Sequence, residues 1–262
     1  MTIILLRGLA RESGHWLDFP QRLEQQLGAK VRCIDFPGCG AHYREPALDN
    51  IGAMSDHARA QIRPGDGQPL VVIGISMGAM VALDWAQRYP QELASVVLIN
   101  SSSGDQPWWW RLRPRALFIT LLALVAPLAW RERLMLGIIS NARVQRSRHL
   151  RQWLKIQRRH PVSRHNMFAM LMAAVHFKPL PECKVKGLVL ASSRDRMVSV
   201  RASQDLAARY HWPIHYHPIA GHDLPLDDPD WMLNEVSEWL APHLERVDDS
   251  RHFIMADQPQ RF

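Results

Sequence analysis

The segment that decides the fold is 70–78, which reads Leu70-Val71-Val72-Ile73-Gly74-Ile75-Ser76-Met77-Gly78. Its first six residues are an apolar run rich in β-branched side chains, which is typical of a strand buried on both faces of a parallel sheet. A helical pattern then covers 77–89 and stops before Pro90. The segment therefore predicts a strand, a sharp turn at Ser76 and a helix.

Strand-like and helix-like segments alternate on both sides of this unit. The other strands are expected at 3–6, 31–36, 94–100, 185–191 and 214–217. Helical patterns cover 16–27, 50–62, 200–210 and 230–244. This alternation predicts an α/β fold with a mainly parallel sheet and helices on both of its faces.

The alternation stops between residues 106 and 178, where charge and composition also change. This segment holds fourteen basic residues and one acidic residue, Glu132, so it carries +13, whereas the remainder of the chain carries −6. It is also rich in tryptophan and other large apolar residues. We therefore expect four parts: a first core segment at 1–105, a basic, Trp-rich helical cap at 106–178, a second core segment at 179–247, and a C-terminal tail at 248–262 without an assigned function.

Composition narrows the class of protein further. The 262 residues are 47% hydrophobic and 22% charged, with a net charge of +7, which favours a folded chain with a sizeable core. Three scattered cysteines, Cys33, Cys39 and Cys183, suit neither a disulfide framework nor a cysteine-based zinc site, and they indicate a reducing compartment. The histidine spacing 211/215/217 suggests no carboxylate or cysteine partner, so we predict no metal and no organic cofactor.

The sequence also bears on location. No basic segment followed by a long apolar stretch precedes the first strand, so we expect no cleaved secretion signal and a cytoplasmic protein. The longest apolar stretch, 116–130, is shorter than a bilayer span and contains Pro127. It is expected to form a buried or interfacial helix.

Ser76 is the first candidate for a chemical role. The pattern G-x-S-x-G at a strand-to-helix turn lifts a serine hydroxyl above the sheet, and the helix N-terminus directs amide donors at developing negative charge. The flanking glycines are needed because side chains at those positions would clash in so sharp a turn. A serine at its ordinary pKa is a weak nucleophile, so this interpretation requires a nearby base.

His222 and Asp195 are the candidates for the base and for the acid that orients it. His222 lies in the loop after the last expected strand, and Asp195 follows the strand at 185–191, so both belong at the same sheet edge as Ser76. Asp105, after the preceding strand, is the alternative acid. Asp223, next to His222, is expected to stabilise the loop.

Together these residues resemble the α/β-hydrolase superfamily. The segment Asp35-Phe36-Pro37-Gly38-Cys39-Gly40 resembles the family's D-x-P-G-x-G loop, and Gly221-His222-Asp223 resembles its histidine loop. The resemblance covers residues 1 to about 105 and 180 to about 245. It implies an α/β-hydrolase fold with a helical lid inserted between strands 6 and 7, in an esterase-like serine hydrolase.

The resemblance also implies an oxyanion hole formed by the backbone N–H groups of Leu9 and Met77. Many members of the superfamily have His-Gly after the first strand, whereas this chain has Arg7-Gly8. Backbone donors do not need the histidine side chain. Arg7 can alter the loop geometry, contact an anionic substrate or pair with an acid.

The predicted activity is hydrolysis of a small-molecule carboxylic ester or thioester through an acyl-enzyme on Ser76. The first alternative is an acyltransferase that uses the same triad. The second is a non-catalytic protein of the same fold whose basic cap binds an acidic carrier or a membrane, because basic and aromatic residues together suit anionic partners. No recognition motif accompanies the arginines, so no nucleic-acid partner is predicted.

Overall fold

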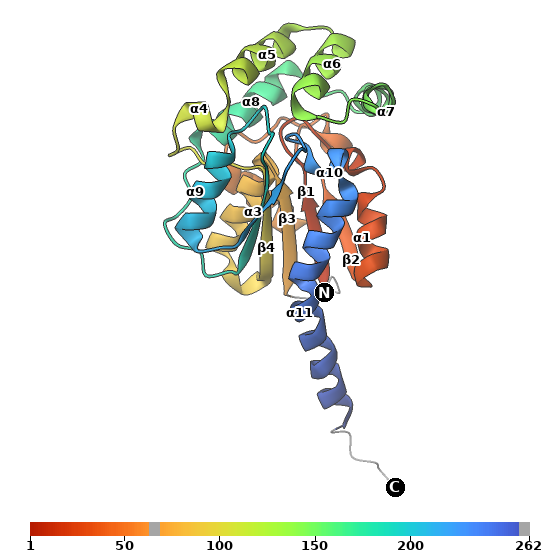
Figure 1. Ribbon diagram of the computed structural model, residues 1–262, viewed down its shortest axis with the longest axis vertical. Helices are drawn as coiled ribbons and strands as arrows, with labels where there is room; N and C mark the ends of the chain where they lie inside the picture. Colours follow the sequence, from red (N-terminus) through yellow and green to blue (C-terminus); the bar gives the residue numbers. More distant parts are fainter. Residues whose placement is uncertain (63–68, 257–262) are drawn as a thin grey trace.

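The computed structural model describes residues 1–62 and 69–256, and a parallel sheet lies at its centre (Figure 1). Its six strands are β1 (Thr2–Leu6), β2 (Lys30–Ile34), β3 (Leu70–Ile75), β4 (Leu93–Ile99), β5 (Gly187–Ser192) and β6 (Ile214–His217). They lie in the order β2-β1-β3-β4-β5-β6, and every neighbouring pair is parallel. The α/β fold with a parallel sheet is therefore confirmed.

Helices cover both faces of the sheet. Ile3 and Leu5 of β1 face a core built with α1 (Phe19–Leu27) and α11 (Pro229–Ala256). Ile4 and Leu6 face the opposite core, built with α2 (Ile51–Ala60), α3 (Met77–Arg88) and α9 (Val200–Tyr210). This division follows from the strand itself, because successive side chains point to opposite faces of a sheet.

The helix predicted at 16–27 is two elements in the structure. A 3₁₀ helix, η1 (Ser13–Trp16), ends before α1 begins at Phe19. Leu17 between them has a φ of 55°, a left-handed conformation that no right-handed helix can contain. Pro20 then lies in the first turn of α1, where its missing N–H costs no hydrogen bond.

The segment assigned to the cap contains five helices above the sheet (Figure 1). They are α4 (Trp108–Arg111), α5 (Pro114–Val125), α6 (Leu128–Ile139), α7 (Arg146–Arg159) and α8 (Arg164–His176). Side chains of α5, α6 and α7, among them Ala116, Leu136 and Trp153, form a small core together with Leu226. Met167 and Met170 of α8 belong instead to the core that contains α2, α3 and α9. The cap lies between β4 and β5 of the six-stranded sheet, not between strands 6 and 7 as we expected, because fewer strands precede it.

Polar contacts join the cap to the loop after β1. Arg11 pairs with Glu132 of α6 at 2.7 Å, and its guanidinium lies 4.2 Å from the ring centroid of Trp153 on α7. The side chain of Gln157 on α7 donates to the carbonyl of Ala10 at 3.2 Å. The single acidic residue of the cap thus attaches it to the core.

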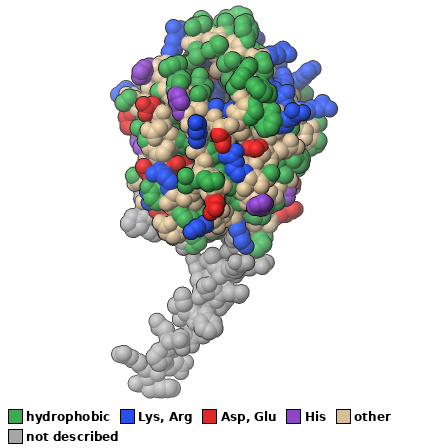
Figure 2. Space-filling model, turned by 90° about the vertical axis from the view of Figure 1, so that its left-hand side faces the viewer, with side chains coloured by type: hydrophobic (Ala, Val, Ile, Leu, Met, Phe, Trp, Pro, Cys, Tyr) green, Lys and Arg blue, Asp and Glu red, His purple; other side chains and the backbone are tan. Residues whose placement is uncertain are grey.

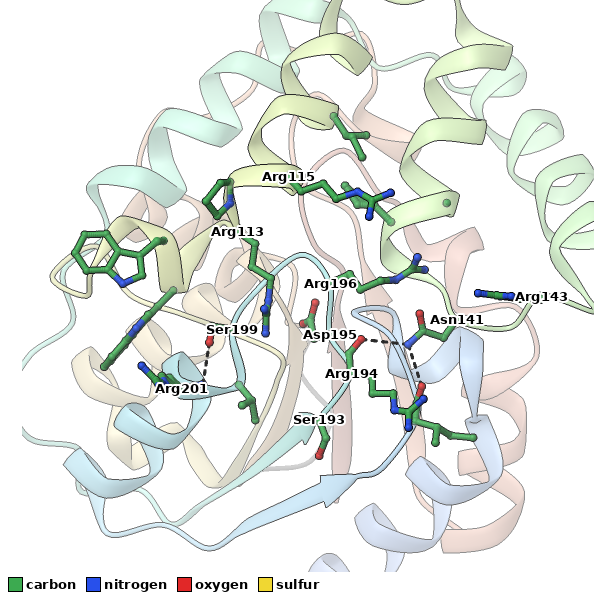
Figure 3. Close-up of a pocket in the computed structure, with 18 residues that line it drawn as sticks. Arg113, Arg115, Asn141, Arg143, Ser193, Arg194, Asp195, Arg196, Ser199 and Arg201 are labelled. Atoms are coloured by element: carbon green, nitrogen blue, oxygen red, sulfur yellow. Dashed lines mark hydrogen bonds between the residues drawn. The ribbon is translucent and has the colours of Figure 1, made fainter.

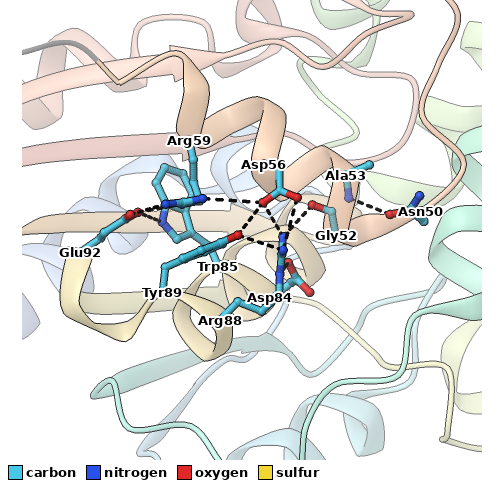
Figure 4. A network of polar contacts seen from close by, with 10 residues as sticks. All are labelled: Asn50, Gly52, Ala53, Asp56, Arg59, Asp84, Trp85, Arg88, Tyr89 and Glu92. Atoms are coloured by element: carbon cyan, nitrogen blue, oxygen red, sulfur yellow. Dashed lines mark hydrogen bonds and ion pairs between the residues drawn. The ribbon is translucent and has the colours of Figure 1, made fainter.

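A second polar network holds α2 against the C-terminal half of α3 (Figure 4). Arg88 bonds to Asp84 on its own helix and to Asp56 on α2, each at 2.8 Å. Arg59 on α2 pairs with Glu92, which also accepts a hydrogen bond from the indole of Trp85 at 2.8 Å. Ser76 immediately precedes the N-terminus of α3, and this network holds the C-terminal end of the same helix in place.

The last helix is longer than the sequence indicated. We expected it to end near residue 244, but α11 continues to Ala256, beyond the body of the protein (Figure 1). The expected tail at 248–262 therefore begins as helix, and its final residues, 257–262, lie outside the described residues. In the described ranges, no helix combines the length and apolar character needed to cross a membrane.

Candidate active site

Ser76 occupies a strained turn between β3 and α3. Its φ and ψ are 56° and −120°, a conformation that is costly for a residue with a side chain. A Cβ on Gly74 would lie 2.3 Å from the carbonyl oxygen of Gly78, and one on Gly78 would lie 2.4 Å from that of Leu6. The turn is held by neighbouring β4, because the N–H of Ser76 donates to the carbonyl of Ile99 at 2.9 Å.

His222 and Asp195 meet in a buried hydrogen bond. Nδ1 of His222 lies 2.7 Å from Oδ2 of Asp195. The other carboxylate oxygen, Oδ1, accepts from the N–H groups of Met197 at 2.7 Å and Val198 at 2.9 Å. With Asp195 as the acceptor, the proton of the neutral imidazole is on Nδ1, and Nε2 is left to accept a proton.

The surroundings of His222 favour its protonated form. Burial lowers the pKa of His222, but the charge of Asp195, its hydrogen bond and the charge of Asp223 outweigh both burial and the opposing charge of Arg7. The net effect raises the pKa of His222 above its ordinary value of 6.5. The imidazole is thus suited to take up a proton at neutral pH.

Arg7 pairs with an acid, one of the three outcomes considered for it. Its two terminal nitrogens lie 3.1 and 2.5 Å from the carboxylate oxygens of Asp223, and both side chains are buried. The guanidinium also lies 4.9 Å from the ring centroid of Trp16. The pair connects the loop after β1 to the loop that carries His222.

The backbone N–H groups of Leu9 and Met77 have no acceptor in the described part of the chain. Both residues line the same cavity as Ser76. A Cβ placed on Gly8 would lie 3.1 Å from Cβ and 3.6 Å from Oγ of Ser76, so the backbone just before Leu9 runs directly against the serine. This close approach is possible because residue 8 is glycine.

Ser76 and His222 line one cavity of about 310 Å³ beneath the cap. Its wall is mainly apolar, and the cap contributes Trp108, Leu117, Met135, Leu171 and Val175. Cavities that bind small molecules are typically apolar with a few polar groups. The arrangement suits an apolar group bound next to a serine and a histidine.

The alternative acid lies elsewhere. Asp105 accepts hydrogen bonds from Ser103 at 2.6 Å and from Arg209 at 2.7 Å. Among the described residues, His222 bonds to Asp195 and not to Asp105. The structure therefore brings His222 together with Asp195, in the chain order that the sequence suggested.

The histidines at 211, 215 and 217 do not share a ligand site. His215 pairs with Glu235, and His217 lies 3.0 Å from Asp228, contrary to the expectation that these histidines lack carboxylate partners. Each contact joins one imidazole to one carboxylate. Over residues 1–62 and 69–256, no group of three or more side chains is arranged to hold a metal ion.

Asn100 is a positioning residue that the sequence analysis missed. It follows β4 directly with a φ of 45°, and its side-chain amide donates to the carbonyl of His222 at 2.8 Å and to the hydroxyl of Ser192 at 3.0 Å. It also accepts from the N–H of Ser192 at 2.7 Å. The sequence did contain a signal for it. Asn100 is a polar residue directly after a buried strand, at the sheet edge where the other candidate residues were expected.

The sequence of this chain is similar to a known protein family and to known proteins. The model of the alpha/beta hydrolase family matches residues 3–236. The probable cadicidin biosynthesis thioesterase of Streptomyces griseus is 35% identical over 80 residues, which are 30% of this chain and 22% of that protein. The pimeloyl-[acyl-carrier protein] methyl ester esterase of Chromobacterium violaceum is 29% identical over 111 residues, 40% of each chain. The matched stretches thus span less than half of either relative.

Solved structures resemble the chain over most of its length. An esterase from Exiguobacterium antarcticum superposes with a TM-score of 0.73 and 13% identity, covering 92% of both chains. A thermophilic esterase from Thermogutta terrifontis has a TM-score of 0.68 and 20% identity, covering 92% of this chain and 90% of that one. At these identities the likeness shows the fold.

Proposed function

Because the chain belongs to the alpha/beta hydrolase family, we propose that it is a serine hydrolase that cleaves a carboxylic ester or a thioester. One observation carries the proposal: His222, which lines the same cavity as Ser76, makes a buried 2.7 Å hydrogen bond to Asp195. A nucleophile, a base and an orienting acid are the groups that acyl transfer to serine requires. The thioesterase and esterase named above support the same class of reaction.

The proposed reaction has two halves. In the first, Oγ of Ser76 attacks the carbonyl carbon while Nε2 of His222 takes the hydroxyl proton, and Asp195 stabilises the imidazolium. The C–O or C–S bond then breaks, and His222 passes its proton to the leaving alcohol or thiol. In the second, His222 takes a proton from water, whose oxygen attacks the acyl carbonyl carbon. The bond between that carbon and Oγ then breaks, and His222 returns the proton to Oγ, which releases the acid and restores Ser76.

The N–H groups of Leu9 and Met77 are proposed to stabilise the oxyanion of each tetrahedral intermediate. Both groups lack an acceptor in the described structure and lie beside Ser76. Donors held in place before the reaction need no reorganisation when charge develops, and one such donor is worth about 3–4 kcal/mol of transition-state stabilisation. This is the role that the family resemblance implied for them.

The cavity indicates the kind of acyl group. Its volume of about 310 Å³ lies at the lower end of the range for small-molecule sites, roughly 300–1,000 Å³. Its walls are mainly apolar, with a few polar side chains among them. We therefore propose an apolar acyl group of moderate length.

The outer surface of the cap supports a membrane as the macromolecular partner. Phe118, Leu121, Leu122 and Val125 of α5 are 45–69% exposed and recur at the spacing of one helix face. Hydrophobic side chains gather at the cap end of the molecule, with Lys and Arg beside them (Figure 2). An exposed apolar stripe on a segment of charge +13 suits an anionic lipid surface better than an acidic carrier protein, because acyl chains can cover the stripe.

We also propose the cytoplasm as the location, which the three free thiols support.

The proposal is tested with a fluorophosphonate probe, which bonds covalently to activated serines. We expect stoichiometric labelling of Ser76, mapped by mass spectrometry, together with hydrolysis of p-nitrophenyl butyrate. The matched control is Ser193→Ala, which changes an exposed serine outside this cavity and should leave both signals intact. Folded protein that neither reacts with the probe nor hydrolyses short esters would contradict the proposed function.

A further inference from the structure

A second and larger cavity lies between the cap and the loop after β5 (Figure 3). Its volume is about 1440 Å³. Part of its wall is made by six arginines from four parts of the chain: Arg113, Arg115, Arg143, Arg194, Arg196 and Arg201. The labelled side chains surround an open space beneath α5 (Figure 3).

These six arginines carry charge that the protein itself does not neutralise. Among the side chains that the structure describes, in residues 1–62 and 69–242, none of the six forms an ion pair with a carboxylate. Asp195 is the one acid on the cavity wall, and its two oxygens are already occupied by His222 and by the N–H groups of Met197 and Val198. Nε of Arg113 is buried without a hydrogen-bond partner.

The arginines also repel one another. Burial lowers the pKa of Arg196, and the charges of Arg146, Arg115 and Arg143 lower it further against the opposing carboxylate of Asp227. Arg196 donates one hydrogen bond, to the carbonyl of Ser140 at 2.6 Å, which is a neutral acceptor. An anion in the cavity would relieve this repulsion, since guanidinium groups bind phosphate oxygens through charge-assisted hydrogen bonds.

The two cavities are neighbours, because consecutive residues in three segments line one or the other. In each case the first-named residue lines the apolar cavity and its neighbour lines the arginine cavity: Trp108 and Trp109, Leu112 and Arg113, Ile139 and Ile138, Met197 and Arg196, Val198 and Ser199. The arginine cavity therefore adjoins the cavity of Ser76 along these segments.

We propose that the arginine cavity binds the nucleoside polyphosphate part of an acyl thioester while its acyl group lies beside Ser76. The inference rests on the proposed function and names its substrate class. Six unpaired guanidiniums match several phosphate charges, whereas the single phosphate of a lipid headgroup would leave most of them unmatched. Trp109 and Trp110 also line the cavity and offer aromatic faces to a base. The volume exceeds that of an ordinary small-molecule site, roughly 300–1,000 Å³.

The test measures binding of free coenzyme A, a thiol product of such a thioester, by isothermal titration calorimetry on the full chain. Pantetheine, which lacks the nucleotide, and glycerol 3-phosphate, which represents a lipid headgroup, are the comparison ligands. We expect coenzyme A to bind far more tightly than either, with an affinity that falls as salt is added.

The variants separate the cavity from general surface charge. Arg115→Gln and Arg201→Gln remove exposed arginines of the cavity wall, and each should weaken coenzyme A binding about tenfold, the value of one charge-assisted hydrogen bond. Arg133→Gln is the matched control, because Arg133 is an exposed cap arginine that lines neither cavity. Circular dichroism checks that the three variants fold alike.

Two results would overturn the proposal. One is coenzyme A binding no tighter than pantetheine or glycerol 3-phosphate, and the other is an equal loss of affinity in Arg115→Gln and Arg133→Gln. The Ser76→Ala variant distinguishes a failure of this binding proposal from a failure of the proposed hydrolase function. It should bind coenzyme A normally and hydrolyse no ester, whereas a wild-type protein that binds coenzyme A without hydrolysing any ester would count against the proposed function alone.

Discussion

The charged side chains around the two cavities beneath the cap differ in whether they form ion pairs. Around the smaller one, Arg7 pairs with Asp223, Arg11 with Glu132, and His222 with Asp195. Around the larger one, six arginines have no carboxylate partner in the described structure. These ion pairs hold backbone loops and the imidazole of His222 in position. The six arginines have no such ion pair, and the proposed ligand would bring the opposite charge to them.

Removing the nucleophile is the strongest test of this division. We expect Ser76→Ala and His222→Ala each to lower kcat for p-nitrophenyl butyrate by roughly 10⁵ to 10⁶-fold, and the double variant to be little worse, because the residues act as a unit. Single-turnover and steady-state assays measure the loss. Ser193→Ala, on the wall of the arginine cavity, should hydrolyse the ester at the wild-type rate. A similar loss in Ser193→Ala would place the chemistry in the wrong cavity.

The hydrogen bond between His222 and Asp195 predicts a smaller loss and a shifted pH profile. Asp195→Asn should lower kcat by roughly 10⁴-fold, since the imidazole loses its orientation and the carboxylate that stabilises its charge. The base acts in its neutral form, and the pKa of His222 is raised, so the acidic limb of the wild-type kcat/KM profile should lie above pH 6.5. Loss of the Asp195 charge lowers that pKa and should move the limb to lower pH. An unmoved limb would show that another group titrates.

Local patterns account for what the sequence predicted. The central strands β1, β3, β4 and β5 were predicted because each is largely a short apolar run, and the turn at Ser76 was predicted because its glycine spacing is local. Asp195 and His222 were placed on one sheet edge because parallel strands end there. The pair of Arg7 and Asp223 joins residues 216 positions apart, and no local signal predicts it. The +13 balance of the cap was visible in the composition, but the meeting of three cap arginines with Arg194, Arg196 and Arg201 in one cavity depends on how four segments pack together.

The buried pair of Arg7 and Asp223 predicts a contrast in stability between the cavities. Arg7→Ala or Asp223→Ala leaves a buried charge without its partner and should lower the free energy of unfolding by about 3–5 kcal/mol. Arg115→Gln should change it by less than about 0.5 kcal/mol, because an exposed arginine without an ion pair contributes little. Urea unfolding monitored by tryptophan fluorescence measures each value.

A double variant, Arg7→Leu with Asp223→Leu, sharpens this test of the pair. Because it leaves no unpaired charge, its cost should be well below the sum of the two single changes. Equal costs for Arg7→Ala and Arg115→Gln would contradict the division between paired and unpaired arginines.

The smallest effect is expected on the outer surface of the cap. Leu121→Ser with Val125→Ser removes two exposed apolar side chains of α5 and should weaken binding to vesicles of phosphatidylglycerol and phosphatidylcholine by roughly tenfold, through the lost transfer of apolar surface. Vesicle sedimentation measures the change. Hydrolysis of p-nitrophenyl butyrate should not alter, since neither residue lines the cavity of Ser76.

Arg133→Gln controls for charge and should weaken binding only slightly, because one surface arginine contributes about 1 kcal/mol to attraction by anionic lipid. Wild-type protein that sediments equally with pure phosphatidylcholine and with the anionic mixture would show that the charge of the cap has no part in the contact.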